Sequence, residues 1–257
     1  MESSLLSQRE IRRYSRQIMI PEIGLEGQEM LRKAKVLVIG AGGLGCPVLQ
    51  YLTVAGIGKI SIVEFDAVDE TNLQRQVLYG TSDIGKLKSI IAKERLEHLN
   101  SNGDFEVINL RFDASNALKI IDGFDVIVDA TDNLETRYVI NDSCVILNKP
   151  MVHGSIYKYE GMVSVFNYQG GPTYRCFNPS GLTDTYKNPS PSQVGLLGVL
   201  PGIAGTLMAN EVIKIIISAG EILSGKILMI NIFNNIFRTF TVTNVPENHN
   251  IKTITNR

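Results

Sequence analysis

Cysteine is scarce in this chain of 257 residues, which holds only three: Cys46, Cys144 and Cys176. They lie far apart and their number is odd, so a framework of disulfides is excluded. Three thiols also cannot supply the four ligands of an all-cysteine zinc site within one chain. We expect Cys46 and Cys144 to be small buried side chains of a hydrophobic core.

The chain also lacks an excess of charge and a long apolar run. Its 25 basic and 26 acidic residues give a net charge of −1, which offers no overall field to attract nucleic acid or an anionic membrane. The longest apolar stretch, residues 194–208, is broken by Pro201 and by glycines and is too short to span a bilayer. The first residues are polar and show no targeting signal. We therefore expect a cytoplasmic protein with neither a nucleic-acid nor a membrane partner.

What the chain does contain is an alternation of apolar strands and helical segments over residues 35–150. The expected strands are 36–39, 59–64, 105–110 and 124–129, and the expected helices are 44–55, 86–99, 114–121 and 135–147. This alternation predicts βαβ units and a mostly parallel, Rossmann-like sheet with helices on both faces. Two helices are expected before it, one from about residue 8, after a capping box of Ser7 and Glu10, and one over 25–34.

The pattern changes after Pro150. Residues 151–157 and 161–168 are expected to pair as antiparallel strands, as are residues 226–233 and 236–242, with a helix over 203–217 between the pairs. The sheet is therefore predicted to continue with antiparallel strands within a single α/β domain over 1–257. Residues 178–193 are polar and rich in proline and serine, and we expect either a surface loop or a mobile lid there.

A glycine motif follows the first strand of the alternation and begins the next helix. Gly40, Gly42, Gly43 and Gly45 match the pattern G-x-G-x-x-G, in which missing side chains let the backbone approach a phosphate. The N-terminus of the helix offers unpaired N–H groups to that anion. Glu64, at the end of the next strand, can accept hydrogen bonds from a ribose. The motif leaves both hydride transfer and adenylyl transfer open.

The residues that follow favour adenylyl transfer. They include carboxylates, amides and cations, namely Asp66, Asn72, Arg75, Gln76 and Lys88. Attack on a triphosphate develops charge that such cations neutralise, whereas a dehydrogenase needs few at this point. Asp132 and Asn133 follow the strand over 124–129, where open α/β sheets bind ligands. Asp132 is therefore expected to bind Mg²⁺, or else to cap the next helix.

Seven short stretches in this order resemble one family. They are residues 13–17, 40–45, 64–66, 72–76, 83–88, 130–133 and 174–176. Together they resemble the MoeB/ThiF/HesA family of ubiquitin-activating-like adenylyltransferases, from about residue 10 to about residue 242. The resemblance implies that ATP and Mg²⁺ are used to activate the C-terminal glycine of a small ubiquitin-fold sulfur carrier ending in Gly-Gly. The carrier would serve molybdopterin, thiamine or tRNA thiolation, and the product would be an acyl-adenylate with release of pyrophosphate.

The resemblance also implies roles for single residues. Arg16, Arg75, Lys88 and Asp132 would be catalytic, with Arg16 reaching the partner subunit of a homodimer and Asp132 binding Mg²⁺. The residues implied to bind the nucleotide are Gly40, Gly42, Gly43, Gly45, Glu64, Asp66, Asn72, Gln76 and Asn133. The chain would divide into N-terminal helices (1–34), a nucleotide-binding half (35–150), a carrier-binding half (151–242) and a polar tail (243–257).

The sequence departs from the family at two places. Many relatives hold a structural zinc with two Cys-x-x-Cys pairs, but Thr173 stands where the partner of Cys176 would be, and the second pair is absent around residues 241–250. We expect no zinc. Some relatives use a cysteine where this chain has Pro191 or Ser192, so no covalent carrier intermediate is expected there.

Two other functions stay open at this point. The same glycine loop would serve an NAD-dependent oxidoreductase, and a chain that binds a nucleotide without turnover would be a non-catalytic module. Arg75, Lys88 and Asp132 argue against both, because neither function requires two cations and a carboxylate near the phosphates. His153 lies alone in an apolar strand and is expected to be a core residue.

Overall fold

The strands form one sheet of eight in a computed structural model that describes residues 5–179 and 195–254. They are β1 (Lys35–Ile39), β2 (Lys59–Val63), β3 (Asp104–Ile108), β4 (Val126–Asp129), β5 (Met151–Tyr157), β6 (Glu160–Phe166), β7 (Lys226–Asn231) and β8 (Ile236–Thr241). Their order across the sheet is β3-β2-β1-β4-β5-β6-β7-β8. The pairs from β3 to β5 are parallel and those from β5 to β8 are antiparallel, which confirms the predicted fold class.

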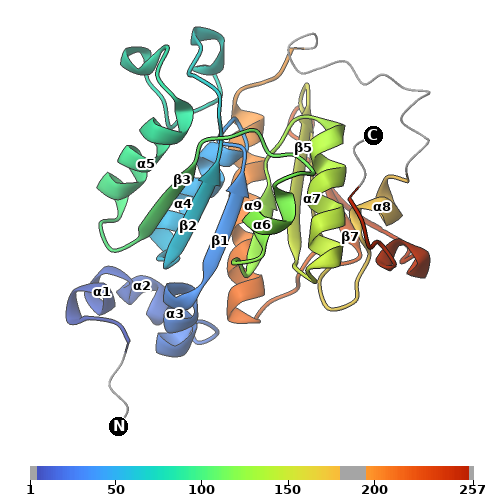
Figure 1. Cartoon of the computed structure of the whole chain (residues 1–257). Coiled ribbons are helices and arrows are strands. Elements are labelled where there is room, and N and C mark those ends of the chain that lie inside the picture. Colours follow the sequence, from blue (N-terminus) through green and yellow to red (C-terminus); the bar gives the residue numbers. More distant parts are fainter. Residues whose placement is uncertain (1–4, 180–194, 255–257) are drawn as a thin grey trace.

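Helices cover both faces of this sheet (Figure 1). One face carries α4 (Gly45–Ala55), α5 (Lys88–Leu99) and α9 (Val199–Ile217), and the other carries α6 (Ala117–Ile121), α7 (Leu134–Ile146) and the short α8 (Tyr174–Phe177). Alternate side chains of β1 belong to two different buried clusters. Val36 and Val38 pack on the first face, and Leu37 and Ile39 pack on the second. A strand buried on both faces is expected to be apolar, as β1 is from Val36 to Ile39.

The helix α9 is long and apolar enough to cross a membrane by length and composition alone. In the fold it packs against α4, β5 and β6, and Leu200, Ala204, Met208 and Val212 are buried there. It is therefore a core helix of one layer, packed over β4, β5 and β6. It begins at Val199, four residues before the predicted start, because a proline such as Pro201 is tolerated in the first turn of a helix.

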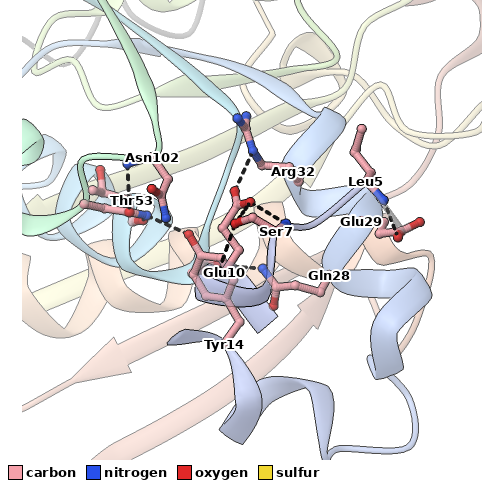
Figure 2. Close-up of polar contacts among 11 residues, drawn as sticks. Leu5, Ser7, Glu10, Tyr14, Gln28, Glu29, Arg32, Thr53 and Asn102 are labelled. Atoms are coloured by element: carbon pink, nitrogen blue, oxygen red, sulfur yellow. Dashed lines mark hydrogen bonds and ion pairs between the residues drawn. The ribbon is translucent and has the colours of Figure 1, made fainter. Parts of the chain in front are cut away.

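Three helices precede β1 and lie beneath the amino ends of the parallel strands (Figure 1). They are α1 (Gln8–Arg13), α2 (Ser15–Ile18) and α3 (Gly24–Lys33). Figure 2 shows the predicted capping box, in which Ser7 N donates to Glu10 Oε2 at 2.9 Å, and the ion pair of Glu10 with Arg32 at 3.0 Å. The hydroxyl of buried Tyr14 accepts from Asn100 Nδ2 at 2.8 Å. These contacts hold the N-terminal helices against the sheet domain.

Three short 3₁₀ helices complete the described elements: η1 (Glu70–Asn72), η2 (Thr81–Asp83) and η3 (Pro246–His249). The last of them lies within the predicted polar tail. Of the predicted loop over 178–193, only residues 178 and 179 belong to the described part of the chain. The choice between a surface loop and a lid therefore lies outside the described residues, as do Pro191 and Ser192.

Candidate functional site

A cavity of about 670 Å³ opens at the carboxyl ends of β1, β2 and β4. The chain runs outward from β1 to β2 and β3 on one side and continues with β4 on the other, so β1 and β4 flank a switch in strand order. Open α/β sheets bind their ligands in the crevice at such a switch. The predicted site residues that line this cavity are Gly40, Gly42, Gly43, Glu64, Asp66, Arg75, Gln76, Lys88, Asp132 and Asn133.

The glycine loop has the close backbone contacts that its motif predicts. Gly40 has a φ of +96°, and a side chain there would place Cβ 2.8 Å from the carbonyl oxygen of Ala130. At Gly45, Cβ would lie 2.1 Å from the carbonyl oxygen of Gly40. Gly45 thus permits close packing of α4 on the loop and does not itself line the cavity. Gly42 and Gly43 present bare backbone to the cavity.

Glu64 holds this loop in place. Its carboxylate accepts from the N–H of Ala41 at 2.9 Å, of Phe65 at 2.8 Å and of Asp66 at 2.9 Å, and the residue is buried. A carboxylate has about four acceptor directions, so one remains for a ribose hydroxyl. Contact with a ribose stays a prediction, and Glu64 has in addition a structural role that the sequence did not indicate.

Two predicted cations face the cavity. Lys88 is buried at the start of α5, and its Nζ lies 3.2 Å from Asp66 Oδ2. Arg75 donates through Nη1 to the carbonyl oxygen of Thr71 at 3.0 Å. Both side chains line the same cavity as the glycine loop, and their contact with the phosphates of a nucleotide stays a prediction.

A third cation, Arg137, was missed by the sequence reasoning. It lines the cavity from α7, and its Nη2 donates to the carbonyl oxygen of Thr131 at 2.9 Å. Its Nε is buried without a hydrogen-bond partner among the described residues. Arg137 follows Asn133 by one helical turn, and this spacing was the available signal.

Two further observations support a nucleotide in this cavity. Gln76 is buried in its wall, and its Oε1 has no hydrogen-bond partner among the described residues. A buried polar atom without a partner is costly, so such an atom in a cavity wall indicates a ligand or water that completes it. Gly42, which has no side chain, lies next to Gln76, since a Cβ at Gly42 would lie 3.6 Å from Gln76 Nε2.

The loop after β4 separates the two roles weighed for Asp132. Asn133 caps α7, because its side chain accepts from Thr136 N at 2.9 Å. Asp132 is exposed at the cavity and makes no hydrogen bond or ion pair within the described residues. The alternative that Asp132 caps the helix is therefore wrong, and its carboxylate is available to a hard cation. No cluster of three or more potential metal-ligand residues occurs in residues 5–179 and 195–254.

Besides Gly45, two more predicted site residues, Asn72 and Arg16, lie outside the cavity. Asn72 closes a capping box on η1, where its Oδ1 accepts from Asp69 N at 3.3 Å. Arg16 is exposed on α2, beneath the amino ends of the strands, whereas the cavity opens at their carboxyl ends (Figure 1). Arg16 is therefore not part of the site within its own chain.

The cysteines and His153 behave largely as expected. Cys46 and Cys144 are buried, and burial raises the pKa of the Cys46 thiol to about 12. His153 is also buried, next to Asp129. The predictions that these three residues belong to the core are confirmed.

Cys176 lies in a corner that joins α8 to the C-terminal segment. Its Sγ accepts from Val245 N at 3.4 Å and from Asn248 Nδ2 at 3.5 Å, and it lies 3.4 Å from Thr173 Oγ1. Burial alone would raise the pKa of this thiol, but these hydrogen bonds outweigh burial and lower it. Thr173, Cys176, Val245 and Asn248 repeat the spacing of two Cys-x-x-Cys pairs with one sulfur instead of four. The absence of zinc stays a prediction.

A glycine loop at the switch point of a mixed sheet, facing cations and an available carboxylate, defines a nucleotide-binding protein of Rossmann type. The model of the ThiF family matches residues 14–251, so the chain belongs to the ThiF family. The predicted family resemblance is thereby confirmed.

Two relatives of this chain are similar to it in sequence over most of its length. The chain is 47% identical over 233 residues to a probable molybdopterin-synthase adenylyltransferase of Porphyra purpurea, covering 91% of this chain and 61% of that protein. It is 44% identical over 243 residues to a sulfur carrier protein adenylyltransferase of Thermus thermophilus, covering 93% of this chain and 89% of that protein. The chain thus spans less than two thirds of the first relative and most of the second.

A solved structure has the same fold. The structure of E. coli MccB with ATP matches with a TM-score of 0.80 and 26% identity, covering 91% of this chain and 72% of that chain. That structure is of a protein of this architecture together with ATP. The Porphyra and Thermus relatives are named as adenylyltransferases, which does not favour the oxidoreductase alternative.

Proposed function

We propose that this chain is an ATP-dependent adenylyltransferase that activates the C-terminal glycine carboxylate of a small ubiquitin-fold sulfur carrier protein. The observation that carries the proposal is the single cavity that joins the glycine loop, Arg75, Lys88 and Asp132. The names of the Porphyra and Thermus relatives supply the reaction and the class of carrier. Together they favour adenylation over simple nucleotide binding.

The glycine loop and the N-terminus of α4 would hold the phosphates of ATP through backbone N–H groups. Arg75 and Lys88 would orient the triphosphate and neutralise the charge that gathers on the leaving pyrophosphate. Asp132 is the residue that would hold Mg²⁺, which shields the phosphate charges when it is bound. An oxygen of the carrier carboxylate attacks the α-phosphorus, the bond to pyrophosphate breaks, and an acyl-adenylate forms. This step requires no side-chain nucleophile from the chain.

The carrier would reach the nucleotide across the antiparallel strands. The cavity continues past Ser155 on β5, Met162 on β6 and Met229 on β7, three residues that are register partners in one row. Arg238 on β8 is the next member of that row and is exposed. A flexible Gly-Gly tail laid along this face would bring its carboxylate to the phosphates, so we assign carrier binding to residues 151–242.

We also propose a homodimer in which Arg16 completes the partner's site. Arg16 is exposed on α2, between Tyr14 and Gln17. Tyr14 is fixed by Asn100, and Gln17 Nε2 donates to Gln28 Oε1 at 2.7 Å. An arginine on a firmly held helix can supply positive charge to a second active site with little loss of conformational entropy.

An exchange assay tests the proposed reaction. Incubated with ATP, Mg²⁺, labelled pyrophosphate and a panel of Gly-Gly carriers, the chain should incorporate label into ATP only when its own carrier is present. Absence of exchange with every carrier, in a preparation that binds ATP, would leave a non-catalytic module and overturn the proposal. Reduction of NAD by the same preparation would do so as well.

A further inference from the structure

A buried acid–histidine pair lies directly behind the wall of the cavity. Asp129 ends β4, and His153 is its register partner on β5. His153 Nδ1 lies 2.6 Å from Asp129 Oδ2, and both side chains are almost fully buried. Burial lowers the pKa of His153, and the hydrogen bond from His153 helps to hold the pKa of Asp129 low against its own burial. The pair is thus a neutral imidazole whose Nδ1–H donates to a carboxylate, since the carboxylate can only accept.

The second oxygen of this carboxylate holds the loop that follows β4. Asp129 Oδ1 accepts from Thr131 N at 3.0 Å and from Thr131 Oγ1 at 2.6 Å. The carbonyl oxygen of Thr131 accepts from Arg137 at 2.9 Å. Thr131 is therefore fixed through its amide, its hydroxyl and its carbonyl. The next residue is Asp132, which has no such contacts of its own among the described residues.

We propose that His153 is a positioning residue which, through Asp129, fixes the loop of residues 130–133 and so sets where Asp132 meets the metal–nucleotide complex. The inference rests on the proposed function, because it takes Asp132 as the Mg²⁺ ligand. Without the Nδ1 donor, the buried carboxylate would lose a charge-assisted hydrogen bond and would no longer have one fixed orientation. The loop hydrogen bonds on its other oxygen depend on that orientation. A small displacement of Asp132 is then sufficient to weaken its contact with Mg²⁺.

The test compares His153→Leu with His153→Asn. Leucine removes the donor at similar volume, whereas the amide nitrogen of asparagine can occupy the place of Nδ1. Ser164→Ala is the matched control, because Ser164 is buried beside His153 on β6 and bonds to the carbonyl of Lys226 instead of to Asp129. Two quantities are measured on the full chain: the affinity for ATP with and without Mg²⁺ by calorimetry, and the amide hydrogen exchange of residues 130–133 without ligand.

His153→Leu should reduce the Mg²⁺-dependent gain in ATP affinity by about tenfold, as expected for loss of one hydrogen bond to a charged group. It should also speed amide exchange in residues 130–133. In His153→Asn, both the Mg²⁺-dependent gain in ATP affinity and the exchange rate should stay close to those of the unchanged chain. The inference is wrong if His153→Leu changes neither the Mg²⁺-dependent gain in ATP affinity nor the exchange of residues 130–133. It is also wrong if His153→Asn and Ser164→Ala change these two quantities as much as His153→Leu does, since that pattern would indicate packing alone.

Two results separate this inference from the proposed function. If Asp132→Asn leaves the Mg²⁺ effect intact, Asp132 is not the ligand, yet exchange at residues 130–133 still tests whether His153 holds the loop. If His153→Leu does not fold, Thr131→Val can be used instead. This variant removes the hydrogen bond from Thr131 Oγ1 to Asp129 Oδ1, and Thr131 is partly exposed. That variant should weaken the Mg²⁺ effect in the same direction, and an unchanged effect would overturn the inference.

Discussion

The two halves of the sheet differ in what their residues must do. In the parallel half, backbone approaches backbone so closely that residue types are fixed, as at Gly45, where a Cβ would lie 2.1 Å from a carbonyl oxygen. In the antiparallel half, all six residues of β8 are exposed, including Phe237 and Phe240. A site for a small nucleotide constrains single atoms, whereas the surface that we propose for the carrier is broad and can be formed by many sequences. Substitutions at the site and in each half of the sheet test this contrast.

The largest effect is expected from Arg16→Ala. Loss of an arginine supplied in trans should lower the rate of adenylation by about 10³-fold or more. The exposed Arg12 of α1 offers a matched control, and Arg12→Ala should keep nearly full activity. Initial rates of pyrophosphate release measure both variants.

Mixing tests whether Arg16 acts across subunits. A mixed dimer of Arg16→Ala and Lys88→Ala contains one site with both residues intact, so random pairing of equal amounts should restore roughly a quarter of the sites. No recovery after mixing and subunit exchange would show that Arg16 does not act in trans.

The next largest effect concerns the parallel half itself. Lys88→Ala should lower kcat for adenylation by about 10²- to 10³-fold, because a buried cation that stabilises transition-state charge is removed. Lys86→Ala is the control, since Lys86 is exposed, pairs with Asp83 and lies outside the cavity. Equal losses in the two variants, measured by steady-state kinetics, would contradict the assignment of the phosphate site.

In the antiparallel half we expect a change in carrier affinity without a change in ATP affinity. Arg238→Ala, in the row of Met229, should raise KM for the carrier on the order of tenfold. Phe237→Ala is the control, because alternate residues of a strand point to opposite faces. If Phe237→Ala has the larger effect, the carrier binds the other face of the sheet.

The smallest effect is expected at Cys176. Cys176→Ala should loosen the segment around Val245 and Asn248, seen as faster amide exchange there, with adenylation within about twofold of wild type. Metal analysis of the purified chain should find no bound zinc. A full equivalent of zinc that is lost in Cys176→Ala would show that the corner still binds metal.

The same contrast explains how far sequence reasoning reached. The parallel half was predicted closely, because the glycine loop and the strand ends that carry Glu64 and Asp132 follow fixed spacings. Arg137 was missed because an arginine one turn into a helix is ordinary in sequence, and only the cavity distinguishes it. The nucleotide contact of Asn72 stays a prediction, and its side chain also serves a local cap, which depends on backbone geometry that the sequence does not reveal.

The antiparallel half was predicted as strands but not as a binding surface. In sequence, a strand with exposed apolar residues such as β8 cannot be distinguished from a buried strand. The pairing of Met229 with Arg238 appears only once the register is known. The corner at Cys176 shows the same limit. The loss of the cysteine pairs could be read from the sequence, whereas the hydrogen bonds that join Thr173, Val245 and Asn248 to the remaining thiol could not.

The intact mass of the carrier after incubation with the chain, ATP and Mg²⁺ decides whether the chain adenylates its carrier. We predict a carrier that gains one adenylyl group at its C-terminal carboxylate, in step with released pyrophosphate, while the mass of the chain itself does not change. An adenylyl group or a carrier attached covalently to this chain, or pyrophosphate release without any adenylated carrier, would contradict it.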